Sequence, residues 1–177
     1  MERTQSARMT SSELFAAMPP ALASDILEYS HANEMKLYRA TLDAVAQARK
    51  LRRVFLERQP RAEQHALLMT CLSRPQFALA ADTLLRYWLL KKHVAVITGF
   101  LDALGIKHEE GAVTDLPPTV EDAPLKNAVE ALLAKHPHDV VAVYLTAFNS
   151  MNGQSWPNLD AMLKEDPRLK VGTGGKT

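Results

Sequence analysis

Apolar residues recur along this chain with helical spacing and predict helices over most of its length. The predicted helices cover residues 11–18, 20–30, 34–59, 61–72, 76–104, 123–135, 139–151 and 157–164. In the fifth of them, apolar residues spread around most of the helical wheel, which is typical of a buried helix. We therefore predict an all-α fold, a multi-helix bundle around a long central buried helix.

Local signals fix several ends of these helices. Thr10 followed by Glu13 is a capping-box pattern, and Pro60 precedes the helix at 61–72. Gly105 followed by Ile106 predicts a glycine cap with its hydrophobic contact. The short apolar run at 140–145 is also compatible with a strand, because period alone does not separate the two in so few residues.

The chain divides into five predicted segments. Residues 1–11 form a disordered tail, and residues 12–105 form an N-terminal helical bundle. Residues 106–123 form an acidic loop, which interrupts the helical pattern with Gly111 and Pro117-Pro118. Residues 124–170 form a helical hairpin packed on the same core, and 171–177 form a second disordered tail.

The predicted helix 34–59 changes character along its length. One stripe, Met35, Tyr38, Leu42 and Val45, and a neighbouring one, Leu37, Ala44, Ala48, Leu51 and Phe55, are apolar. The first stripe then continues as Arg49, Arg52 and Arg53 before Leu56 restores an apolar position. A helix face that begins inside the core thus becomes cationic.

The composition is that of an ordinary globular protein, with 47% hydrophobic and 23% charged residues and a net charge of +1. Cys71, the single cysteine, excludes an intrachain disulfide and fits a reducing compartment. The N-terminal residues lack the apolar core of a signal peptide. The longest apolar run, residues 140–145, is far below the roughly 20 residues that span a bilayer. We expect a cytoplasmic protein with no membrane partner.

Basic residues gather at positions 49–61 and are the candidate partner-binding residues: Arg49, Lys50, Arg52, Arg53, Arg58 and Arg61. Residues 39–61 hold seven basic residues against two acidic ones, a net charge of +5, and residues 102–122 hold six acidic residues against one lysine, a net charge of −5. Three interpretations stay open: the acidic loop lies along the basic helix, an acidic protein or a second copy binds it, or it contacts nucleic-acid phosphates. Arginine suits all three, because its planar fork pairs with carboxylates and phosphates.

The nucleic-acid interpretation has a structural form. Helices at 61–72 and 76–92, joined by Ser73-Arg74-Pro75, could act as a helix-turn-helix-like unit beside the basic helix. Phe55 is the single aromatic residue among the arginines, which is a weak basis for base stacking.

Catalytic chemistry has little support in the residues. His108 with Glu109 and Glu110, and His136 and His138 with Asp139, would form a metal site only if the two clusters converged. Thr98, Gly99 and Gly105 partly match the TGxxxGxG pattern of short-chain dehydrogenases, but Ala103 replaces the middle glycine and the upstream segment has a helical pattern. Cys71 lies among apolar residues, as a core cysteine does. We expect no cofactor, no catalytic residue and no bound metal.

Four segments resemble a group of bacterial all-helical proteins of similar length that have no assigned function. The segments are LLRYWLLKKH (84–93), FLDALGI (100–106), DVVAVYL (139–145) and WPNLD with DPRL (within 156–169). The resemblance covers most of the chain and implies no activity. The function expected from the residues is that of a non-enzymatic helical interaction or adaptor protein, whose basic helix engages an acidic partner or a second copy. Nucleic-acid binding is the alternative, and a metal-dependent enzyme with a His/acid site comes third.

Overall fold

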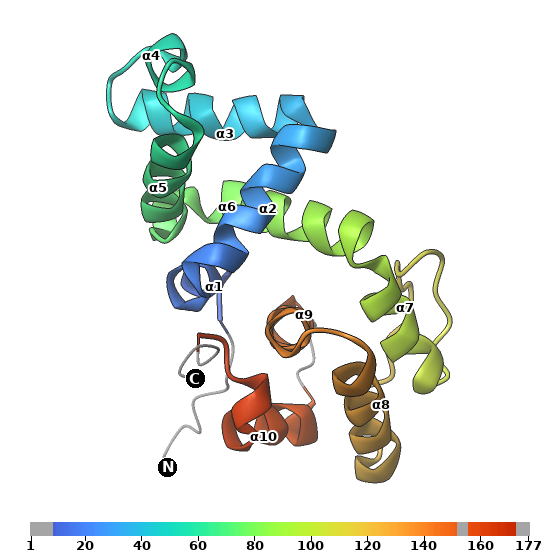
Figure 1. Ribbon diagram of the computed structural model, residues 1–177. Coiled ribbons are helices and arrows are strands. Elements are labelled where there is room, and N and C mark those ends of the chain that lie inside the picture. Colours follow the sequence, from blue (N-terminus) through green and yellow to red (C-terminus); the bar gives the residue numbers. More distant parts are fainter. Residues whose placement is uncertain (1–8, 152–155, 173–177) are drawn as a thin grey trace. The chain divides into compact units, whose positions relative to one another are not determined.

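The computed structural model of the chain describes residues 9–151 and 156–172 (Figure 1). Within these ranges the backbone forms ten α-helices, two 3-10 helices and one π-helical turn, and it contains no strand. The prediction of an all-α fold is confirmed. The chain divides into two compact units: residues 10–88, here called the N-terminal unit, and residues from 89 onward together with Met9, here called the C-terminal unit.

The N-terminal unit contains six α-helices, counted within the described residues. They are α1 (Ser11–Ala17), α2 (Pro20–Asn33), α3 (Met35–Ala48), α4 (Arg53–Glu57), α5 (Arg61–Leu72) and α6 (Ala78–Tyr87), with the 3-10 turn η1 (Pro75–Phe77) before α6. Helix α2 packs against α3, α5 and α6, and α1 packs against α5 and α6. Leu14, Ile26, Leu42, Leu68 and Leu84 are among the side chains that this packing buries.

The start of α1 follows the predicted capping box. The Thr10 hydroxyl accepts a hydrogen bond from the Glu13 N–H at 3.2 Å, and the Glu13 carboxylate accepts one from the Thr10 N–H at 2.9 Å. Two N–H groups that the first turn of a helix leaves without partners are thereby satisfied. Helix α5 begins directly after Pro60, as predicted.

The prediction of one helix over residues 34–59 is wrong. Helix α3 ends at Ala48, and Lys50 adopts a left-handed backbone conformation with φ of 54°. The Leu51 N–H donates to the Ala46 carbonyl at 2.8 Å and the Lys50 N–H to the Gln47 carbonyl at 3.1 Å, which together form a Schellman cap. A left-handed backbone conformation costs a residue with a Cβ about 1 kcal/mol. The turn therefore forms against the backbone preference of Lys50.

The predicted helix 76–104 is also divided. Helix α6 ends at Tyr87, a π-helical turn, η2 (Trp88–Lys92), follows, and α7 (Val94–Ala103) begins after His93. The interruption falls at His93, directly before the β-branched Val94. The division between the two compact units lies inside this stretch, between Trp88 and Leu89. A single central helix therefore does not form.

The C-terminal unit consists of α7 with three later helices and a short turn. These are α8 (Asp122–Lys135), α9 (His138–Met151), α10 (Pro157–Glu165) and the 3-10 turn η3 (Pro167–Leu169). Helices α8 and α9 pack against α7 and against each other, and α10 and η3 pack against α9. Every residue from 140 to 147 is buried, so the segment that was compatible with a strand is an internal helix.

The acidic loop contains a tight turn that rests on α7. Gly105, with φ of 68°, and Ile106 form the predicted glycine cap, in which the Ile106 N–H donates to the Leu101 carbonyl at 2.9 Å. Further on, Glu110 and Gly111 both have positive φ, and Glu109 and Ala112 pair as an isolated β-bridge. A Cβ at Gly111 would lie 2.9 Å from Cγ2 of Ile97, so glycine permits the close approach.

Some predicted boundaries stay predictions. The boundary between the two compact units falls at Trp88 and Leu89, inside the predicted segment 12–105. It does not test the predicted limits of the segments 12–105 and 124–170. Residues 1–8 and 173–177, most of the two predicted disordered tails, lie outside the described residues. Ser11, assigned to the first tail, belongs to α1.

Candidate interaction surface

The six candidate basic residues fall into two groups. Arg53 and Arg61 pair with acids of their own unit: Arg53 contacts Asp43 at 2.9 Å and Glu57 at 3.2 Å, and Arg61 contacts Glu28 at 3.1 Å. These pairs are partly exposed, so each contributes at most about 1 kcal/mol to stability. They connect α4 to α3 and α5 to α2.

The other four basic residues are exposed, and no ion pair joins them to any part of the chain that the structure describes. They are Arg49, Lys50, Arg52 and Arg58. The end of α3 at Ala48 removes Arg49 and Arg52 from the helix face on which they were predicted to lie. We call residues 49–58 the basic segment. Whether the acidic loop covers it stays a prediction, since the loop belongs to the other unit.

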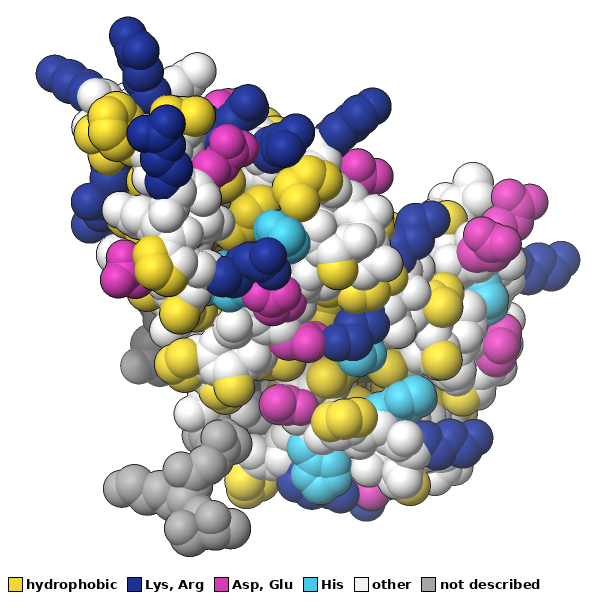
Figure 2. Space-filling view, turned by 45° about the horizontal axis from the view of Figure 1, so that its top comes forward, with side chains coloured by type: hydrophobic (Ala, Val, Ile, Leu, Met, Phe, Trp, Pro, Cys, Tyr) yellow, Lys and Arg dark blue, Asp and Glu magenta, His cyan; other side chains and the backbone are white. Residues whose placement is uncertain are grey.

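Three apolar side chains are exposed within the basic segment: Leu51 is 48% exposed, Val54 46% and Phe55 56%. Leu51 and Phe55 belong to the second apolar stripe of the predicted helix 34–59, and that helix does not continue beyond Ala48. The turn at Lys50 rotates α4 relative to the predicted helix, so that Leu56 is the residue that packs inward. Figure 2 shows dark-blue side chains gathered around yellow ones at the upper left, in the part of the N-terminal unit that carries α4.

The predicted helix-turn-helix-like unit corresponds to α5, η1 and α6. Ser73 ends α5 and donates its hydroxyl to the Met69 carbonyl at 2.7 Å. On α6, Arg86 is paired with Asp82 at 2.8 Å, and the Thr83 hydroxyl donates to the Leu79 carbonyl at 2.9 Å. Asp82 also accepts a hydrogen bond from the Ser11 hydroxyl of α1 at 3.1 Å, so these polar groups of α6 have partners within the N-terminal unit.

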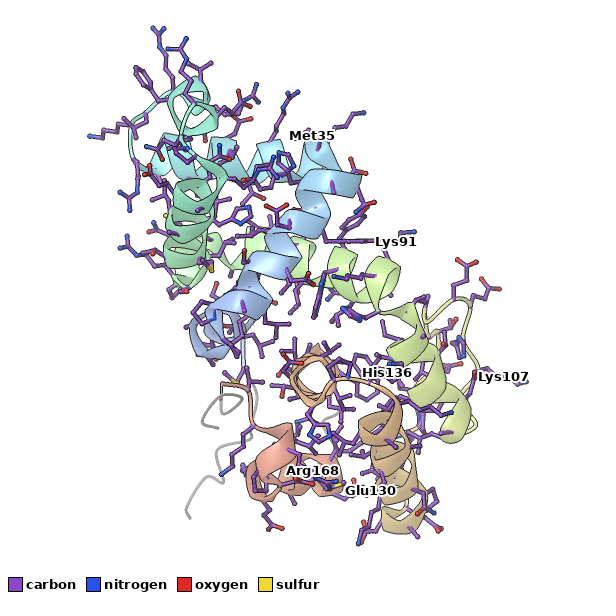
Figure 3. All side chains as sticks on the ribbon, viewed as in Figure 1. Met35, Lys91, Lys107, Glu130, His136 and Arg168 are labelled. Carbon is purple, nitrogen blue, oxygen red and sulfur yellow. The ribbon has the colours of Figure 1, made fainter. Side chains whose placement is uncertain are left out.

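The two histidine clusters have separate local roles. His108 Nε2 lies 2.7 Å from Asp102 Oδ1, and its Nδ1 accepts a hydrogen bond from the Gly111 N–H at 3.1 Å, which supports the turn of the acidic loop. His136 follows the end of α8, and His138 begins α9 (Figure 3). Among the described residues, no three histidine, cysteine or acidic side chains are placed so that they could hold a metal ion.

Thr98 and Gly99, from the dehydrogenase-like pattern, lie in the middle of α7. A dinucleotide-binding glycine loop follows a strand, and this one does not. Cys71 is buried in the core of the N-terminal unit, as the apolar residues around it predicted.

Arg168 links two elements of the C-terminal unit. Its guanidinium contacts Glu130 of α8 at 2.6 Å and Asp166 at 2.8 Å (Figure 3). The Arg168 side chain lowers the pKa of both the Glu130 and the Asp166 carboxyl groups by hydrogen bonding to their charged forms. The Arg168–Glu130 ion pair thus joins η3 to α8.

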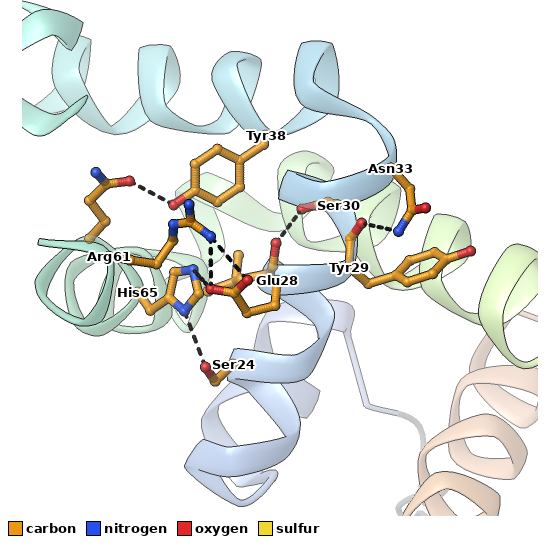
Figure 4. A network of polar contacts seen from close by, with 10 residues as sticks. Ser24, Glu28, Tyr29, Ser30, Asn33, Tyr38, Arg61 and His65 are labelled. Atoms are coloured by element: carbon orange, nitrogen blue, oxygen red, sulfur yellow. Dashed lines mark hydrogen bonds and ion pairs between the residues drawn. The ribbon is translucent and has the colours of Figure 1, made fainter.

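A polar network that the sequence did not predict lies between α2, α3 and α5 (Figure 4). Ser24 Oγ lies 3.1 Å from His65 Nδ1, and Glu28 Oε1 lies 3.5 Å from His65 Nε2. The second distance is an electrostatic contact, because Nε2 has no hydrogen bond. His65 is only 4% exposed. The residues come from positions up to 41 apart, so no sequence spacing could have grouped them.

The order Ser24, His65, Glu28 resembles a hydrolase triad, but the setting differs. Ser24 is the fifth residue of α2, where the surrounding backbone N–H groups are used by the helix and cannot stabilise an oxyanion. Glu28 is already engaged by Arg61. The arrangement is that of a structural network in which Nδ1 of a buried imidazole has a hydrogen-bond partner and Nε2 has only an electrostatic contact.

Tyr38 and Gln64 form the second half of this network. The Tyr38 hydroxyl donates to Gln64 Oε1 at 2.8 Å, and Gln64 Nε2 donates to the carbonyls of Glu57 at 3.2 Å and Gln59 at 2.8 Å. Burial raises the pKa of Tyr38 to about 12, so it stays a donor at neutral pH. Gln64 thereby ties the end of α4 to α3 and α5.

His65 and His31 predict a pH dependence of stability. Burial lowers the pKa of His65 and of His31, against attraction from Glu28 and with added repulsion from Arg61. Because the unfolded chain then binds more protons below its pKa of 6.5, the contribution is complete above that pH and is lost as pH falls below it. We expect the N-terminal unit to be less stable at pH 5.5 than at pH 7.5, measured by urea unfolding followed by circular dichroism.

The control is His65→Gln, whose amide does not titrate and which should reduce this dependence to the part that His31 contributes. The interval lies above the ordinary carboxyl pKa values of 3.8 and 4.5, so Asp166 and Glu130 do not enter it. A wild-type stability that rises toward pH 5.5 would contradict the prediction.

Comparison of the chain with protein-family models, with curated proteins and with solved structures finds no match. The resemblance to a bacterial group therefore stays a prediction. Within the described ranges, no helix has the length and apolar character required to cross a membrane.

Proposed function

We propose that the protein is a non-enzymatic interaction module whose basic segment binds an acidic surface of another protein in the cytoplasm. The observation that carries the proposal is the separation of the cations into two groups. Arg53 and Arg61 are engaged with acids, whereas Arg49, Lys50, Arg52 and Arg58 have no ionic partner among the described residues. The net charge of the whole protein is only +1, so this concentration of exposed positive charge distinguishes the basic segment from the rest of the chain.

The charge pattern favours a protein partner over nucleic acid. Nucleic-acid readers place basic or polar side chains on a helix that enters a groove, or stack bases on several aromatic rings. Here Arg86 of α6 is paired with Asp82, and Phe55 is the one aromatic residue of the basic segment. A cytoplasmic location is part of the proposal, because Cys71 is a free, buried thiol and suits a reducing compartment.

Binding of fluorescent poly-L-glutamate, measured by anisotropy at about 20 mM salt, tests the proposal, because exposed charges are least screened there. We expect the wild-type protein to bind, and a variant with four basic residues of the segment neutralised to bind at least about 10-fold more weakly. The variant is Arg49→Gln, Lys50→Gln, Arg52→Gln and Arg58→Gln.

The matched control removes the same charge elsewhere, at exposed residues that also have no ion pair within the described part: Lys36→Gln, Arg74→Gln, Lys107→Gln and Lys135→Gln. This control should bind like the wild type. Tighter, segment-dependent binding of a DNA or RNA oligonucleotide would favour the nucleic-acid function instead. Segment-dependent dimerisation in analytical ultracentrifugation would identify a second copy as the partner.

A further inference from the structure

The exposed apolar side chains of the protein are concentrated in the basic segment. Of the large hydrophobic residues that are exposed in the described part of the chain, half lie within five positions: Leu51, Val54 and Phe55. Single exposed hydrophobic residues are common and need no explanation, but a cluster rimmed by charges is characteristic of an interaction site. The four unpaired basic residues flank and interleave with these three.

The basic segment is held in this shape by contacts on its inner side. Leu56 is buried, and Arg53 bridges Asp43 and Glu57. The Schellman cap at Lys50 fixes the start of the segment, and Gln64 binds the Glu57 and Gln59 carbonyls at its end. A surface that is ordered before binding loses little conformational entropy on association.

From this arrangement we infer that the partner presents apolar side chains flanked by acidic ones, so that Leu51, Val54 and Phe55 form the centre of the contact and the cations its rim. This inference rests on the proposed function and specifies its partner. Protein interfaces commonly combine an apolar, desolvated centre with a charged rim, in which the centre provides most of the affinity and the charges steer the encounter.

A peptide partner fits this surface better than a lipid bilayer does. Helices that lie in a membrane interface present a long apolar face, commonly over several turns. Helix α4 has five residues and exposes two apolar side chains, with Leu51 in the preceding turn as the third. Such a small apolar area is suited to a pair or trio of partner side chains.

Two synthetic peptides of equal length and equal negative charge test the inference by titration. One carries leucine and phenylalanine between its glutamates, and the other carries serine at the same places. We expect the apolar peptide to bind the wild-type protein roughly 10-fold or more tightly than the serine peptide. In the variant Leu51→Ser, Val54→Ser, Phe55→Ser this difference should disappear, while binding of the serine peptide is retained.

The control variant Met35→Ser, Leu79→Ser removes two exposed apolar side chains from outside the basic segment and should keep the difference. Equal affinity of the two peptides for the wild type would overturn the inference while leaving the proposed function intact. Binding of neither peptide would mean that the proposed function itself fails. Phe55-dependent binding to phosphatidylglycerol vesicles that exceeds binding to the apolar peptide would also overturn it, in favour of a membrane.

Discussion

Replacing Trp156 by alanine is expected to destabilise the C-terminal unit by about 3–5 kcal/mol, because it removes a large, fully buried side chain and leaves a cavity. The indole ring lies 5.1 Å from the ring of Phe148, and its N–H donates to the Pro117 carbonyl at 3.0 Å. The loss is comparable with the total stability of a small domain, which is about 5–15 kcal/mol.

The effect should extend to the acidic loop. Pro117 belongs to this loop, and Asn158, two residues after Trp156, donates to the Val120 carbonyl at 2.7 Å and to Asp122 at 2.9 Å. Trp156 and Asn158 thus join the end of the loop to α10. When the indole is removed, we expect amide hydrogen exchange in residues 113–121 to accelerate together with that of α10.

Urea unfolding followed by circular dichroism measures the change in stability. Trp156→Phe is the comparison variant, since it keeps an aromatic ring and loses the hydrogen bond and part of the indole packing, and it should therefore cost less than Trp156→Ala. Fluorescence of Trp88, the other tryptophan, reports on the N-terminal unit in both variants. An unchanged unfolding midpoint in Trp156→Ala would contradict the packing described here.

The second large effect is expected at Tyr38. Replacement by phenylalanine should cost the N-terminal unit about 1–3 kcal/mol, because the buried Gln64 Oε1 then has lost its hydrogen-bond donor. The aromatic ring and its edge-to-face contact with His31, at 4.8 Å, are kept, so the change isolates the hydroxyl. Unfolding by urea at pH 7.5 measures the difference.

A double-mutant cycle with Gln64→Leu sharpens this result. Gln64→Leu alone should cost more than Tyr38→Phe, since it also removes the donor to the Glu57 and Gln59 carbonyls. The two changes should be coupled by about 0.5–3 kcal/mol, as expected for residues in direct contact. Tyr87→Phe is the control, because no hydrogen bond to the Tyr87 hydroxyl is present within the described residues. Strict additivity in the cycle would contradict the Tyr38–Gln64 bond.

Helices and their caps were accessible from the sequence because they depend on residues close together in the chain. The Thr10 and Glu13 box and the glycine cap at Gly105 each use side-chain or backbone properties within a few positions. The end of α3 uses the same cap with Lys50 in place of glycine. The segment RKLRR contains no glycine, proline or asparagine, so no local signal separated α3 from α4.

For the candidate site, too, the sequence predicted some properties and the tertiary structure decided others. The concentration of six basic residues at 49–61 is visible in the sequence, but the single helix predicted to carry most of them ends at Ala48. The exposure of Leu51, Val54 and Phe55 follows from the tertiary structure. Which cations remain available depends on partners distant in the chain: Glu28 for Arg61, and Asp43 for Arg53.

The order of residues therefore decided that this protein is helical, where most of its helices begin, and that positive charge is concentrated at 49–61, because periodicity, caps and composition are local properties. Folding decided the turn at Lys50, the burial of Leu56, the exposure of Phe55 and the network around His65. These depend on contacts between helices, and such contacts can outweigh a local cost of about 1 kcal/mol at a single residue.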